Sequence, residues 1–89
     1  MTELQKELWG AHGTDFLDRL GVLAIGPQYR LEDVFGADWN GLGDGTRRQN
    51  IGRAISAAFL ENHPEIDLTR FEQTEVDGSP NRMQYRRLR

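Results

Sequence analysis

Few residues in this chain have the type and spacing that catalysis or metal binding requires. The segment Gly41–Thr46 has three glycines before a predicted helix and could hold an anion, but it lacks the lysine and the spacing of a phosphate-binding loop. Asp38, Asn40 and Asp44 suggest a calcium loop, yet a leucine occupies the next ligand position and no terminal glutamate follows correctly. We therefore interpret this segment as a turn that presents the helix.

The remaining chemistry-bearing residues stand alone. His12 and His63 are the two histidines of the chain, and neither has carboxylates at the spacing of a metal site. Ser56 and Ser79 have no base evident in the sequence, and a serine nucleophile requires one. The sequence therefore predicts a protein that is not an enzyme and that uses no metal and no cofactor.

The arginines are distributed unevenly. The chain has a formal net charge of −3, but residues 1–45 carry three basic side chains against eight acidic ones, whereas residues 46–89 carry eight arginines, no lysine and six acids. Arginine is preferred where a planar fork grips phosphate, carboxylate or a base edge, although codon bias explains this usage equally well. The distribution hints at a contact surface in the second half of the chain.

Length and composition bound the class of protein. A chain of 89 residues without cysteine builds one small domain with a thin stability margin and no disulfide. The longest uncharged run is too short to span a bilayer, and the N-terminus lacks the basic start and apolar core of a signal peptide. We expect a single cytoplasmic domain over residues 1–89.

Apolar periodicity and turn residues divide the chain into short elements. Gly10 and Gly13 interrupt the helical spacing near the N-terminus, so we expect two short helices there. Alternation near the C-terminus, broken by a turn cluster, predicts a β-hairpin with a loop of about five residues. In order, the expected elements are a helix over 2–9, a helix from about 14 to 24, a strand over 28–31, a helical turn over 32–35, a turn-rich loop over 37–45, a helix from about 47 to 62, and strands from about 66 to 76 and over 82–88.

The helix from about 47 to 62 has the clearest pattern. Thr46 and Gln49 match the two ends of a capping box, which predicts Thr46 as the N-cap. Apolar residues recur between Ile51 and Phe59 at i, i+4, i+7 and i+8, and they mark the buried side. The opposite side is expected to display Arg47, Asn50, Arg53, Ala54 and Ala57, flanked by Gln49 and Ser56.

This order of elements is typical of a winged helix-turn-helix, an α+β fold in which helices pack on a small antiparallel sheet. The C-terminal hairpin would form the wing and pair with the short strand, because a lone hairpin cannot bury a core. We therefore divide the domain into an N-terminal helical region over 1–27, a segment with the strand, the short helix and the long helix over 28–63, and the wing hairpin over 64–89.

Five segments of the chain carry a resemblance to a known family. They are Tyr29–Gly36, Trp39, Gly45–Arg48, Ile51–Arg53 and Asn81–Arg87. Through them residues 28–87 resemble small bacterial and phage winged-helix-like proteins, the uncharacterised DUF1413 type. The resemblance implies a winged helix and a phage or mobile-element setting, but no established activity.

The first functional hypothesis is a small regulator of transcription that binds duplex DNA. The long helix would enter the major groove, where arginine reads guanine and Asn or Gln reads adenine, while the wing follows the backbone. In the competing interpretation the arginines solvate the helix face and pair with Glu72, Glu75 and Asp77. The candidate DNA-binding residues are Arg47, Arg48, Gln49, Asn50, Arg53, Ser79, Asn81, Arg82 and Arg86.

The alternative hypothesis is a protein–protein interaction module, such as a phage or mobile-element adaptor or inhibitor. An acidic chain is a poor nonspecific DNA binder, because its own charges oppose the phosphates. Leu4, Leu8 and Trp9 form an apolar patch that would either dock on the domain or join a second copy in a homodimer. The expected partners are thus duplex DNA, a protein or a second copy, and no membrane.

Overall fold

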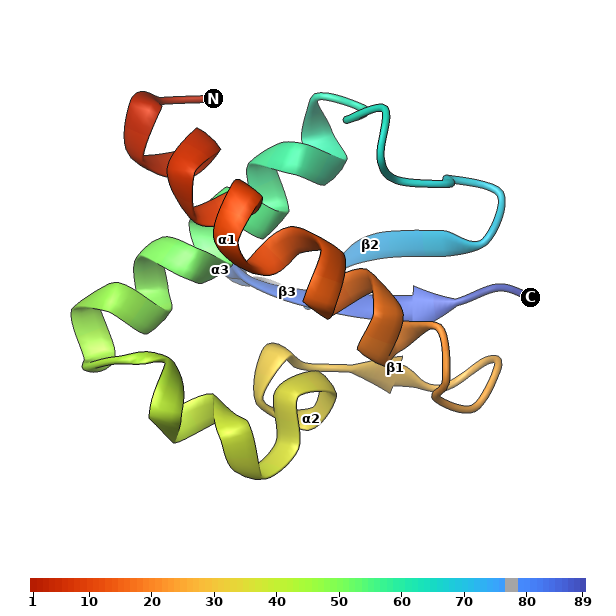
Figure 1. The fold of residues 1–89 in the computed structure, drawn as a ribbon. Helices are drawn as coiled ribbons and strands as arrows, with labels where there is room; N and C mark the ends of the chain where they lie inside the picture. The colour runs from red at the N-terminus through yellow and green to blue at the C-terminus, as the bar shows by residue number, and fades with distance from the viewer. Residues whose placement is uncertain (77–78) are drawn as a thin grey trace.

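Within residues 1–76 and 79–89, three α-helices pack against a small three-stranded antiparallel sheet, which confirms the expected α+β class (Figure 1). The computed structural model describes the backbone of residues 1–76 and 79–89 and the side chains of residues 1–75 and 83–89. The elements are α1 (Glu3–Leu20), β1 (Gln28–Tyr29), α2 (Leu31–Phe35), the 3₁₀-helix η1 (Gly36–Leu42), α3 (Gly45–Leu60), β2 (Phe71–Val76) and β3 (Ser79–Arg87).

The sheet has the order β1–β3–β2, so β3 is the central strand. Tyr85 of β3 lies opposite Tyr29 of β1 and Gln73 of β2, which confirms that the terminal hairpin pairs with the short strand. Two boundaries differ from expectation. β2 begins at Phe71 rather than near residue 66, and β3 begins at Ser79, so only residues 77–78, which lie outside the described residues, separate the two strands instead of about five.

The N-terminal region is one helix rather than the two that were expected. Thr2 caps α1 through its hydroxyl, which accepts the Gln5 N–H at 3.1 Å, while the Gln5 side chain accepts the Thr2 N–H at 2.9 Å. The two glycines do not interrupt the helix. Gly13 lies directly under the Trp9 indole, and a Cβ at residue 13 would lie 2.6 Å from Trp9 Cδ2. The absence of a side chain lets the ring pack against the helix, and tertiary packing stabilises α1 despite its low intrinsic helix propensity.

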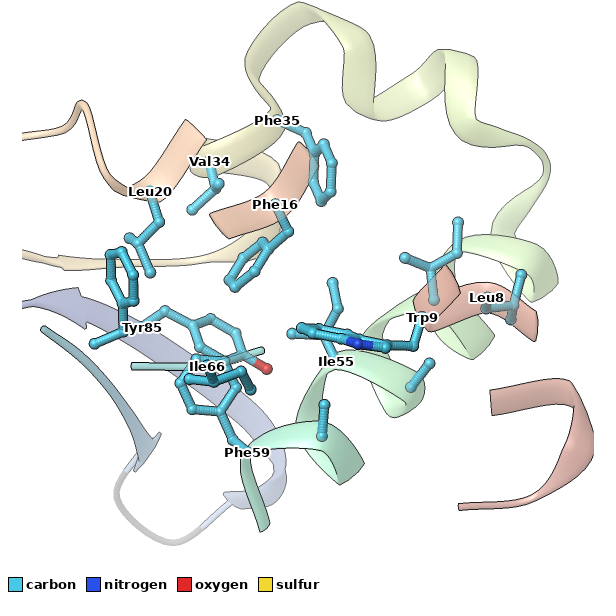
Figure 2. Packing of buried hydrophobic residues seen from close by; sticks show 14 residues of the cluster. Leu8, Trp9, Phe16, Leu20, Val34, Phe35, Ile55, Phe59, Ile66 and Tyr85 are labelled. Carbon is cyan, nitrogen blue, oxygen red and sulfur yellow. The ribbon is translucent and has the colours of Figure 1, made fainter. Parts of the chain in front are cut away.

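The core is built around aromatic side chains from helices and sheet (Figure 2). The Tyr85 ring lies 5.0 Å from the ring of Phe16 on α1 and 5.2 Å from that of Phe59 on α3. Leu8 and Trp9 occupy the other end of the same cluster and are buried, whereas Leu4 is exposed. The sequence left two roles open for this N-terminal patch. Leu8 and Trp9 fulfil the first of them, which is docking on the domain.

The connection from α2 to α3 is more regular than the expected loop. Gly36 ends α2 with a φ of 59°, as its position in the sequence predicts, but the chain continues as η1. The N-cap of α3 is Asp44 and not Thr46, because the Asp44 carboxylate accepts the Arg47 N–H at 2.8 Å. An acidic residue two positions upstream thus takes the capping role, and α3 begins at Gly45.

Candidate nucleic-acid interface

The buried side of α3 is wider than the sequence predicts. Ala54 was expected on the outward side but is fully buried, together with Ile51, Ile55 and Ala58. The reason is that α1 packs on α3 in addition to the sheet, so two layers cover the helix. The outward side consequently centres on Gln49 and Arg53.

A surface groove of about 800 Å³ runs beside this outward side. The wall formed by α3 includes Gln49, Arg53 and Leu60, and β3 contributes Met83 and the deeply placed Tyr85. The residues that line it are Gln5, Leu31, Trp39, Gly45, Arg48, Gln49, Gly52, Arg53, Ser56, Ala57, Leu60, Met83 and Tyr85. Two of these described residues are arginines and none is a carboxylic acid, in a chain in which acids outnumber bases.

Arg47 does not line this groove. Its Nε donates to the carbonyl oxygen of Leu42 at 3.1 Å, so the guanidinium stabilises the turn between η1 and α3. Its charge also acts on His12 of α1: burial of the imidazole, and then the Arg47 charge, lower the pKa of His12 below its ordinary value. Arg47 therefore lies on the side of α3 that faces α1.

Arg48 lines the groove, and two contacts hold its side chain in place. Its Nη1 donates to the Asn40 side-chain oxygen at 2.5 Å, and its guanidinium carbon lies 5.9 Å from the Trp39 ring centroid. The Phe35 ring stacks on Trp39 at 5.8 Å. These contacts pre-position the guanidinium at the edge of the groove, where it can meet an anion at little entropic cost.

Gln49 and Arg53 are four residues apart on α3, so they lie one above the other on the outward side. Both are exposed, and neither side chain makes a hydrogen bond or ion pair within residues 1–75 and 83–89. Asn50 is half-buried and is not among the residues that line the groove. The two outward side chains are thus available to a ligand.

Arg86 lies on the opposite face of the sheet from Tyr85, since successive strand residues alternate. Its Nη2 donates to Glu72 Oε1 at 2.9 Å, which matches the competing interpretation that this arginine pairs with an acid of the hairpin. The side chains of Ser79, Asn81 and Arg82 fall outside the described side chains. Of the nine sequence candidates, the structure brings together Arg48, Gln49 and Arg53 and separates Arg47, Asn50 and Arg86 from them.

Sequence reasoning missed the apolar part of the groove. Leu31 was expected in a strand and Trp39 in a loop, and both line the groove and are only partly buried. Met83 shares one face of β3 with Tyr85, because side chains alternate between the two faces along a strand. This alternation is the one sequence signal that placed Met83 near α3. Leu60 was not singled out, and it is 70% exposed.

No protein-family model, no curated protein and no solved structure matches this chain. Within residues 1–76 and 79–89, no helix is long and apolar enough to cross a bilayer. In the same described part of the chain, no cluster of three or more His, Asp or Glu side chains could hold a metal ion. Function must therefore be inferred from the groove itself.

Proposed function

We propose that the protein is a small winged-helix regulator that binds duplex DNA through α3. The order of the elements supports this proposal, as does the pairing of β1 with the hairpin that follows α3. In such an arrangement α3 is the recognition helix and the β2–β3 hairpin is the wing. The resemblance of residues 28–87 to the DUF1413 type belongs to the same proposal.

The observation that carries the proposal is the pair Gln49 and Arg53 on the outward side of α3. Arginine can donate two hydrogen bonds to guanine O6 and N7, and glutamine can pair with adenine N6 and N7, so both suit a major-groove edge. Arg48, held by Asn40 and Trp39, suits a phosphate contact that fixes the helix on the backbone. Among the described side chains that line the groove, none is a carboxylate.

The number of arginines in the groove predicts how strongly DNA binding should depend on the salt concentration. Among the described side chains, Arg47 and Arg86 are engaged in internal contacts away from the groove, and Arg48 and Arg53 line it. Each phosphate that a cation neutralises contributes a slope of about −0.9 to the plot of log affinity against log salt concentration. Arg48 is the one described arginine of the groove that is assigned to a phosphate, so it contributes a slope of about −0.9, which is a shallow salt dependence and implies weak nonspecific binding.

The test is selection from a random duplex pool at low salt, followed by fluorescence anisotropy with the enriched sequence. Arg53→Ala should weaken binding by about 1–3 kcal/mol, or roughly 5- to 150-fold. The control is Arg89→Ala, which removes the same charge beyond the C-terminal end of β3, where Arg89 donates to the Thr69 hydroxyl. No binding to any duplex, or equal losses in both variants, would contradict site-specific recognition by α3.

A further inference from the structure

β2 forms an open edge of the sheet (Figure 1). Within the described part of the chain, β3 is its one neighbouring strand. The Leu88 N–H donates to the Arg70 carbonyl oxygen at 2.6 Å, so the main chain of residue 70 faces the β3 side. Because main-chain groups alternate between the two sides of an antiparallel strand, those of Gln73 and Glu75 face outward. Among the described residues, no main-chain hydrogen bond reaches these outward N–H and C=O groups.

A pocket of about 260 Å³ opens beside this edge. Three leucines that line it are exposed to solvent: Leu60 of α3 by 70%, Leu68 by 44% and Leu88 by 36%. Phe71 and Glu72 of β2 also line it, so the pocket adjoins the strand directly. Natural sheets protect their free edges, whereas this edge combines free main-chain groups with exposed apolar side chains. Such a combination suits the attachment of another strand.

We infer that β2 binds an extended segment of a partner protein by antiparallel strand addition. Main-chain hydrogen bonds to Gln73 and Glu75 would hold the segment, and the pocket would take an apolar side chain opposite Phe71. The Arg70 guanidinium carbon lies 4.8 Å from the Phe71 ring centroid, and Glu75 is exposed at the other end of the edge. The segment that fits therefore has a basic residue opposite Glu75 and an acid beside Arg70.

A second copy of this chain is a poorer occupant of the edge. Two antiparallel β2 strands related by a two-fold axis pair residues of the same sheet face, so their pairing is centred on a residue. Centred on Gln73, the pairing sets Phe71 opposite Glu75 of the second copy, and a carboxylate would face the apolar pocket. Centred on Glu72, it sets two carboxylates opposite each other, and centred on Thr74 it leaves Phe71 without a partner in β2.

The probe is the fluorescein-labelled peptide Lys-Thr-Val-Thr-Leu-Glu, which places its lysine opposite Glu75, its valine opposite Gln73 and its leucine opposite Phe71. A peptide with the lysine and the glutamate exchanged keeps the composition and should bind severalfold more weakly in anisotropy titrations. An N-methyl group on the valine removes the N–H that would donate to Gln73 and should weaken binding up to about tenfold. The matched control is an N-methyl group on the next threonine, whose N–H faces away from β2, and it should change the affinity by less than about twofold.

Amide hydrogen exchange, followed by NMR on the full-length protein, locates the added strand. At saturating peptide, the outward N–H groups of Gln73 and Glu75 should exchange at least about tenfold more slowly. The N–H groups of Glu72 and Thr74 face β3 and should change little. The N–H of Met83 is the control for the other open edge, because it faces the β1 side of β3, where the pairing with β1 ends at Tyr85.

One pair of variants tests the pocket. Leu60→Glu places a carboxylate in its apolar lining, at a position too exposed to threaten folding, and should weaken binding at least about tenfold. Leu4→Glu adds the same charge at the start of α1, on a side chain that is 47% exposed, and should leave the affinity within about twofold.

The outcomes are distinct. Slower exchange at Gln73 and Glu75, with loss of binding in Leu60→Glu but not in Leu4→Glu, would support strand addition at β2. Unchanged exchange at these two amides at millimolar peptide, or slower exchange at Met83 instead, would overturn it. Protection of the same amides in a dimer without peptide, detected by light scattering, would assign the edge to a second copy and also overturn it. None of these measurements contains DNA, so this inference and the proposed function fail separately.

Discussion

Replacement of Gly13 by alanine tests why α1 is one continuous helix. A Cβ at residue 13 would lie 2.6 Å from Cδ2 and Cε2 of the Trp9 indole, well inside the ~3.5–4.0 Å of a favourable carbon–carbon contact. The indole cannot easily move away, because Trp9 is 4% exposed and its ring lies 5.1 Å from that of His63. The added methyl group must therefore displace a buried ring.

The expected magnitude follows from two opposing terms. Alanine in place of glycine favours a helix interior by about 1 kcal/mol, whereas overpacking of a well-packed core costs about 1–3 kcal/mol. Because the overlap at Gly13 involves a large buried ring, we expect the upper part of that cost and a net loss of about 1–2 kcal/mol in the free energy of unfolding. For a domain of this size the melting temperature should fall by roughly 5–15 °C.

Gly10 provides the matched control in the same helix. No atom lies within 4 Å of a Cβ placed there, so Gly10→Ala should gain about 0.5–1 kcal/mol from helix propensity alone. Both variants can be measured by urea unfolding with circular dichroism at 222 nm and tryptophan fluorescence. If Gly13→Ala is as stable as Gly10→Ala, the Trp9 ring is not held over residue 13, and this account of α1 is refuted.

Three further measurements address the cap of α3, the buried Tyr85 and the partly buried His12. Asp44→Ala should lower the free energy of unfolding by about 1 kcal/mol and Thr46→Ala by less than about 0.5 in urea titrations; equal losses would refute the Asp44 cap. Burial raises the pKa of Tyr85, so the unfolded chain releases this proton first, and stability should fall as pH rises above about 10, by up to ~1.4 kcal/mol per pH unit. Tyr85→Phe should flatten that decline, and an unchanged slope would exclude this phenol as its source. Burial lowers the pKa of His12, so the unfolded chain binds this proton more tightly, and stability should decline as pH falls through about 6.5; His12→Gln should lose this component, and superimposable profiles would contradict it.

Elements with a strong local signal were predictable. α3 was expected over about 47–62 and is observed at Gly45–Leu60, and the helical turn expected over 32–35 is observed as α2 at Leu31–Phe35. The pairing of the terminal hairpin with the short strand was also correct. These features depend on apolar periodicity, on a glycine with positive φ and on the need of a small sheet for several strands, all of which act over short sequence distances or follow from element order.

The candidate site was predicted only in part. Arg48, Gln49 and Arg53 do line one groove, as their positions near the start of α3 suggested. Helical spacing could not reveal that Arg47 would bond to the Leu42 carbonyl, because this contact depends on where the preceding element ends, whereas the pairing of Arg86 with Glu72 matches the competing interpretation. The sequence also predicted too wide an outward side for α3, because the apolar periodicity of one helix does not show that a second layer of the fold covers it.

The amino-acid sequence by itself determined the class of the fold, the place of the long helix and the supply of arginines near it. Tertiary structure alone decided that α1 continues through Gly10 and Gly13, that Ala54 is buried, and that residues of α3 and β3 line one groove. The physical reason is the sequence distance over which each kind of interaction acts. Periodicity and turn chemistry are properties of neighbouring residues, whereas burial and the partner of each arginine depend on the packing of segments far apart in the chain.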